Sequence, residues 1–82
     1  MEKMEASFSM LAMSIASSAA MAMGIAPDPS TGKTHTPDKS LARFNIDLLL
    51  MLRDKTRNNL TDEEKKFLES IIADLQIKFI QT

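Results

Sequence analysis

A long uncharged segment is the feature that most constrains this chain. No Asp, Glu, Lys or Arg occurs from Ala6 to Pro27, although charged residues make up 26% of the whole sequence. The segment is rich in Ala and Met, which are strong helix formers. A helix that is uncharged on every side has to be covered by protein or by lipid. What covers this helix therefore decides what kind of protein the chain forms.

The rest of the composition narrows the function classes. The 82 residues allow one small domain, which we place at residues 1–82. There is no cysteine, which excludes disulfides and fits a reducing cytoplasm. A single histidine excludes a zinc site of the usual Cys/His kind, and a net charge of −1 offers nothing to attract nucleic acid. We expect no metal, no cofactor and no nucleic acid partner.

The sequence predicts an all-α fold. Gly24 is placed to end a first helix, because glycine adopts the left-handed conformation that follows many helix ends. All three prolines lie at about residues 25–37, which predicts an extended connection there. A short link after Arg57 then makes the second and third helices an antiparallel hairpin. The predicted helices lie at about residues 5–23, 38–57 and 62–80.

Local start and turn signals support these boundaries. Thr36 or Asp38 is the N-cap of the second helix. Asn58 tolerates the left-handed conformation that the turn after this helix requires. Thr61 and Glu64 have the spacing of a capping box, in which each side chain bonds to the backbone of the other residue.

Apolar spacing predicts the buried faces. In the second helix, residues at three- and four-residue spacing form one apolar face, which Ile46 and Leu49 widen. The residues of that face are Leu41, Phe44, Leu48, Met51 and Leu52. The opposite, solvated face consists of Arg43, Asp47, Asp54 and Arg57, with Leu50 among them. The expected core positions of the third helix are Phe67, Leu68, Ile71, Ile72, Leu75 and Phe79.

Composition disfavours lipid around the first helix. A membrane span needs ~20 mostly apolar residues, often with Trp or Tyr at the ends. This segment has no Trp or Tyr, and it is diluted by Ser7, Ser9, Ser14, Ser17 and Ser18. A removable signal peptide begins with positive charge, whereas Met1–Glu5 is net acidic. We therefore expect protein to cover the helix.

A hairpin of two helices covers about half of the circumference of a third helix. The uncovered half of the uncharged first helix therefore predicts contact with a second subunit. We expect a homodimer or a higher oligomer. Large apolar residues form one stripe along the first helix, and small alanines beside it allow close approach of another helix. The predicted interface residues are Phe8, Leu11, Ala12, Ile15, Ala16 and Ala19.

Motifs that would carry chemistry are weak. Gly32–Thr34 resembles the end of a phosphate-binding loop, but that motif requires glycine at the position of Pro27. His35 has no activated nucleophile, and Asp47 is placed to pair with Arg43 one turn away. An enzyme would need a site shared between subunits around His35, Asp47 and Arg43. We therefore predict no catalytic residue.

The ordered residues resemble a known family. The first half of the match consists of Ser14–Ala19, Gly24 and Pro27–Gly32. The second half consists of Leu41–Ala42, Ile46–Asp47, Met51–Leu52, Lys55–Thr56, Asn59–Thr61 and Glu64. Together they resemble the small bacterial domain-of-unknown-function family numbered eighteen forty-four over about residues 7–80. The resemblance implies a small bacterial helical protein and supplies no catalytic residue.

Three residues depart from the pattern of that family. Asn58 replaces a glycine, Leu50 replaces an acidic residue and Gln76 replaces an arginine. Leu50 is apolar on a face otherwise charged, so we consider it a candidate contact with a partner.

Taken together, the sequence favours a non-enzymatic interaction or regulatory module that self-associates through its first helix. The alternative is a peripheral membrane protein, or a subunit of a membrane complex, that uses this helix as an anchor. The partner, the pathway and the number of subunits do not follow from the sequence.

Overall fold

Three helices make up the described part of the chain. A computed structural model describes residues 6–81, in which α1 spans Phe8–Ala22, α2 spans Lys39–Lys55 and α3 spans Asp62–Gln81. This confirms the predicted all-α fold. Ser7 caps α1 by accepting a hydrogen bond from the Met10 N–H at 3.1 Å, so the helix begins at Phe8. The predicted helix began too early, because Ala6 and Ser7 precede α1 in the structure. The predicted first residue, residue 5, lies outside the described residues.

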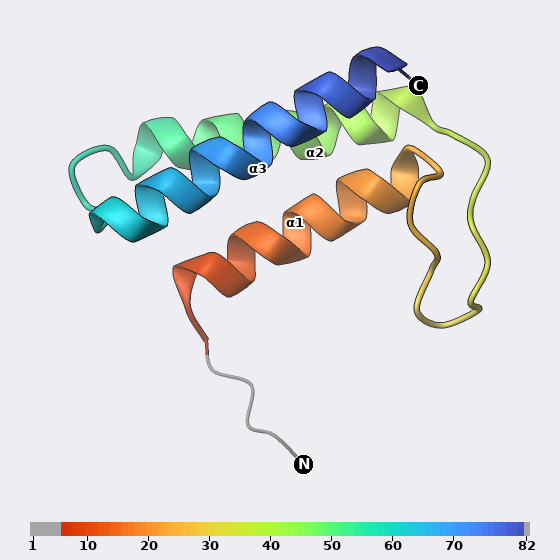
Figure 1. Cartoon of the computed structure of the whole chain (residues 1–82), viewed down its shortest axis with the longest axis horizontal. Helices are drawn as coiled ribbons and strands as arrows, with labels where there is room; N and C mark the ends of the chain where they lie inside the picture. The colour runs from red at the N-terminus through yellow and green to blue at the C-terminus, as the bar shows by residue number, and fades with distance from the viewer. Residues whose placement is uncertain (1–5, 82) are drawn as a thin grey trace.

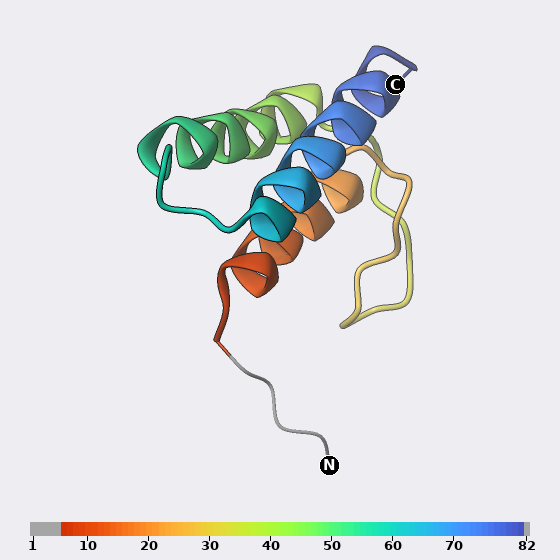
Figure 2. The same cartoon turned by 60° about the vertical axis from the view of Figure 1, so that its left-hand side comes forward.

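Each helix packs against the other two. In Figure 1, α1 and α3 run in the same direction across the view, and α2 runs in the opposite direction. Figure 2 shows α3 lying over α1 while α2 crosses to one side of this pair. The segment between α1 and α2 is a long loop that stands out from one end of the helices (Figure 1).

The end of α1 follows from Gly24. This residue has a φ of +75°, and its N–H donates to the Met21 carbonyl at 3.0 Å. The next N–H, of Ile25, donates to the Ala20 carbonyl at 3.1 Å. These two bonds form the paired arrangement that satisfies the last carbonyls of a helix, as predicted from the glycine.

The loop closes where α2 begins. The Asp38 N–H donates to the carbonyl of Ala22 at 2.7 Å, which ties the start of α2 to the end of α1. The Asp38 side chain accepts from the Leu41 N–H at 3.1 Å, so Asp38, rather than Thr36, is the N-cap of α2. The loop is closed again nearer its tip, where the Asp28 N–H donates to the Lys33 carbonyl at 2.9 Å.

The turn before α3 also follows the sequence prediction. Asn58 has a φ of +69°, which is the left-handed conformation expected of it. The Thr61 N–H donates to Glu64 Oε1 at 2.9 Å, and the Glu64 N–H donates to Thr61 Oγ1 at 3.1 Å. Both bonds of the predicted capping box are therefore present.

The core lies where the three helices meet. Ala12 and Ala19 of α1 are completely buried, and their small side chains let the helix approach its neighbours closely. Leu68, Ile72 and Leu75 of α3 are buried, and the remaining predicted core residues of α3 pack on them half-buried.

The buried face of α2 corrects the sequence prediction. The buried face consists of Ala42, Asn45, Ile46 and Leu49. Ile46 and Leu49 are therefore buried as predicted, whereas Ala42 and Asn45 were not predicted. The predicted face is half-buried at Leu48 and Leu52 and exposed at Leu41, Phe44 and Met51. The helix is rotated because it has to contact both α1 and α3, which together cover the side that carries Ile46 and Leu49.

Candidate functional site

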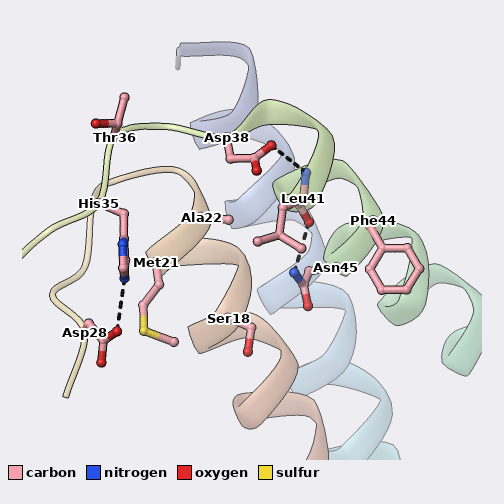
Figure 3. Close-up of a pocket in the computed structure, with 10 residues that line it drawn as sticks. All are labelled: Ser18, Met21, Ala22, Asp28, His35, Thr36, Asp38, Leu41, Phe44 and Asn45. Carbon is pink, nitrogen blue, oxygen red and sulfur yellow. Dashed lines mark hydrogen bonds and ion pairs between the residues drawn. The ribbon is translucent and has the colours of Figure 1, made fainter. Parts of the chain in front are cut away.

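A hollow of about 490 Å³ lies where α1, α2 and the loop between them meet. Figure 3 shows the side chains around it. Helix α1 contributes from its last turns, α2 from its first turns, and the loop supplies the polar groups. The lining residues are Ser18, Met21, Ala22, Asp28, His35, Thr36, Asp38, Leu41, Phe44 and Asn45.

The wall of this hollow on the helices is mainly apolar. Leu41 and Phe44 of α2 are 48% and 58% exposed, and Met21 of α1 is half-buried beside them. Asn45 is buried, and its Nδ2 donates to the Leu41 carbonyl at 3.0 Å, within its own helix. An apolar surface of this kind, with a few polar groups, is suited to receive an apolar side chain.

The loop side of the hollow carries two side chains that are hydrogen-bonded to each other, His35 and Asp28. His35 Nε2 lies 3.1 Å from Asp28 Oδ2, and the other oxygen of Asp28 accepts from Ser30 Oγ at 2.6 Å and from the Ser30 N–H at 2.8 Å. The Ser30 hydroxyl, its backbone N–H and His35, in that order, lower the pKa of Asp28 below its ordinary value of 3.8. Each of these bonds favours the charged carboxylate.

This polar cluster is arranged to hold the loop. The Ser30 hydroxyl donates to Asp28 and not to His35, so the geometry does not activate the hydroxyl as a nucleophile. The other carboxylate at the hollow, Asp38, is engaged as the N-cap of α2.

The comparison with protein families matches almost the whole chain. The family described as Domain of unknown function (DUF1844) matches residues 5–81. The chain belongs to this family. The match confirms the resemblance that the sequence motifs indicated. No curated protein and no solved structure matches the chain.

None of the helices within residues 6–81 has the length and apolar character needed to cross a membrane. The family description names no activity, so function has to be argued from the structure of this member.

The three residues considered for an enzyme do not converge. His35 lies in the loop with Asp28, whereas Arg43 and Asp47 lie on α2 and face a second hollow. Arg43 Nε is 3.4 Å from Asp47 Oδ1 in an exposed pair, which confirms the predicted i,i+4 ion pair.

The chain itself covers much of the predicted oligomer interface. Ala12 and Ala19 belong to the core of the single chain. Phe8, Ile15 and Ala16 are half-buried and pack against this core. Helices α2 and α3 therefore cover the alanine side of α1, and this side is not an open surface.

Part of α1 remains uncovered. Leu11 is 49% exposed, and Met10 and Met13 are 43% and 44% exposed. Leu11 shares one side of the helix with Ser18 and Ala22, which stand seven and eleven positions further along and line the first hollow. Met10 lies on the side of Met21, which stands eleven positions further along and also lines the hollow, whereas Met13 lies on another side.

Leu50 is not the isolated surface residue that the charge pattern indicated. It is half-buried and packs against the core, because α3 approaches this side of α2. Together with Gln76, Phe79 and Ile80 it lines the second hollow, of about 360 Å³. Two of the three departures from the family pattern, Leu50 and Gln76, thus lie at the same place.

Sequence reasoning missed the first hollow. Its apolar residues on α2 were recognised, but they were assigned to the buried face. The bond between Asp28 and His35 has no signal in the sequence, since the two residues are seven positions apart in an irregular loop.

Proposed function

We propose that this protein is a non-enzymatic interaction module of the bacterial cytoplasm that self-associates, with α1 at the contact between subunits. The observation that carries the proposal is that Leu11 is 49% exposed on a helix that has no charged residue. Exposed apolar surface of this kind is typical of protein–protein contacts.

The charged residues support a non-enzymatic role. Three exposed ion pairs join residues that are three or four positions apart in the chain, and they do not span a cleft. The pairs are Arg43–Asp47 at 3.4 Å, Arg57–Asp54 at 3.5 Å and Lys78–Asp74 at 2.9 Å. A net charge of −1 also leaves little electrostatic repulsion between copies of the chain.

The test is the mass of the protein in solution. Gel filtration with light scattering at micromolar concentrations should give at least twice the 9.1 kDa of one chain. Leu11→Glu should shift the protein toward the single chain, because it places a charge at the contact. Ser70→Glu adds the same charge at an exposed position of α3 and serves as the control. A wild-type protein that stays monomeric at these concentrations would contradict the proposal.

The exposed residues of α1 also fit the alternative of peripheral attachment to a membrane. The helix has no Lys or Arg to bind anionic headgroups, which makes this alternative weaker. Sedimentation with vesicles of neutral and of anionic phospholipid distinguishes the two. Binding of a monomer to vesicles, lost in Leu11→Glu, would favour the membrane over self-association.

A further inference from the structure

Helix α2 carries an apolar stripe that the chain does not cover. Leu41, Phe44, Leu48 and Met51 follow one another at spacings of three, four and three residues. Leu48 is half-buried, and the other three are exposed, Met51 by 43%. This spacing places the four side chains along one side of a helix, as in seams between paired helices.

The hollow described above adjoins this stripe. Figure 3 shows the Phe44 ring standing at the side of the hollow, with Leu41 and Asn45 between it and α1. On α1 the hollow is bordered by Ser18 and Ala22, whose small side chains leave it open. Each molecule therefore presents a protruding aromatic ring next to a space of about 490 Å³.

We propose that this stripe and hollow bind the same surface of a second copy of the chain. In the two-fold arrangement, Phe44 of each copy occupies the hollow of the other. A ring and a hollow side by side on one face are self-complementary, which is the property that a two-fold contact requires. The inference rests on the proposed self-association and names the surface that carries it.

The area of this surface suits a stable pair. A standard contact covers ~800 Å² per partner, which is about an eighth of the 6042 Å² that the chain exposes. Helices α1 and α2 have 15 and 17 residues. With a rise of ~1.5 Å per residue and a diameter of ~10 Å per helix, the two helices side by side present a face of roughly 25 × 20 Å. A corrugated face of this size supplies accessible area of the required order, and Leu11 extends its apolar part along α1.

Charge does not oppose the contact. The stripe contains no charged residue, and Asp47 beside it is paired with Arg43. The carboxylates at the hollow are also engaged, Asp28 with Ser30 and His35 and Asp38 with the start of α2. Two copies therefore meet without bringing unpaired carboxylates together.

Exposed apolar residues away from the hollow provide comparison variants. Met13 lies on another side of α1 and is 44% exposed, and Ile77 and Ile80 of α3 are 59% and 81% exposed. Ile77 stands between Gln76 and Lys78 on a largely polar part of the helix. Neither Met13 nor Ile77 borders the first hollow.

Sedimentation velocity over a range of concentrations tests the proposal. Phe44→Glu should raise the dissociation constant of the dimer at least about thirty-fold, as expected for an aromatic residue at the centre of a contact. Met13→Glu and Ile77→Glu should leave it within about threefold of the wild type. Circular dichroism should show the same helix content in all four proteins, because all three substituted side chains are exposed.

Cross-linking provides a second measurement, which detects directly that two residues of different copies lie close together. The chain has no cysteine of its own. In the proposed dimer, Phe44 of one copy lies near Met21 of the other. A mixture of the single variants Phe44→Cys and Met21→Cys should form a mixed disulfide under mild oxidation. A mixture of Phe44→Cys and Ile77→Cys should do so at least about tenfold less.

The outcomes separate this inference from the proposed function. If Met13→Glu or Ile77→Glu dissociates the dimer and Phe44→Glu leaves it intact, the proposed contact surface is wrong. The proposed self-association would still stand. A wild-type chain that is monomeric throughout would overturn both. Dissociation by Phe44→Glu, together with the selective cross-link to Met21→Cys, is the result that supports the proposal.

Discussion

Two glycines with the same backbone conformation differ in their surroundings. Gly24 and Gly32 have φ values of +75° and +71°. A Cβ at Gly24 would lie 2.7 Å from the His35 carbonyl oxygen, whereas a Cβ at Gly32 would meet nothing within 4 Å. Gly32→Ala should therefore cost only the left-handed backbone strain, about 1 kcal/mol.

Gly24→Ala should cost at least about 2 kcal/mol, because the loop backbone has to move in addition. Urea denaturation of both variants measures this difference. Equal losses of unfolding free energy would show that the loop does not press on Gly24.

The Asp28 cluster predicts a dependence of stability on pH. The pKa of Asp28 is lowered in the folded chain, first by the Ser30 hydroxyl. The folded state therefore holds the proton less tightly than the unfolded state does. The stabilisation by Asp28 is complete above its ordinary pKa of 3.8 and is lost as the pH falls through the lower pKa of the folded state.

We expect Asp28→Asn to lower the urea midpoint at pH 7 and to differ less from the wild type at pH 2.5. Carboxyl-carbon NMR titration of Ser30→Ala should show a higher pKa for Asp28 than in the wild type, since the largest cause of the shift is removed. An unchanged pKa in Ser30→Ala would mean that the hydroxyl does not hold the carboxylate.

At the scale of single elements, the start of α3 is the most clearly specified. Thr61 and Glu64 bond to each other's backbone N–H groups. Thr61→Ala should lower the unfolding free energy by about 1 kcal/mol, and Glu64→Ala by less. The double variant should lose less than the sum, because the two bonds form one reciprocal unit. Strictly additive losses in denaturant melts would argue against this coupling.

Helix α1 has a buried alanine side and an exposed side. Ala12→Glu should lower the unfolding free energy by several kcal/mol, since the carboxylate has no partner in the core. Ser17→Glu adds the same carboxylate to the same helix at an exposed position, and it should change the unfolding free energy little. Melting curves at one low protein concentration, at which subunits are separated, compare the two. Similar melting temperatures would show that the alanine side is not packed as described.

At the scale of the whole molecule, the proposed self-association predicts that stability depends on protein concentration. A dimer that forms only from folded chains raises the melting temperature by mass action. For a domain of this size, a tenfold rise in concentration should raise it by about 3–6 °C. Phe44→Glu should abolish this dependence, and Ile77→Glu should retain it. A melting temperature that is the same at all concentrations would contradict the proposed assembly.

The sequence determined the local features of this protein. Gly24, Asp38, Asn58 and the Thr61–Glu64 pair act on backbone groups within a few residues of themselves, so their effects could be predicted without the fold. The helices were placed correctly for the same reason. Family membership likewise follows from the order of residues.

Only the tertiary structure decided which side of α2 is buried. The helix has two overlapping apolar stripes, one through Leu41 and Phe44 and one through Ile46 and Leu49. Both stripes were predicted to be buried, but α1 and α3 cover only the one through Ile46 and Leu49. Which side of α2 is buried depends on how closely the alanines of α1 let α2 approach and on where α3 packs against the other two helices. These contacts join residues far apart in the chain, and they leave Phe44 exposed beside the hollow.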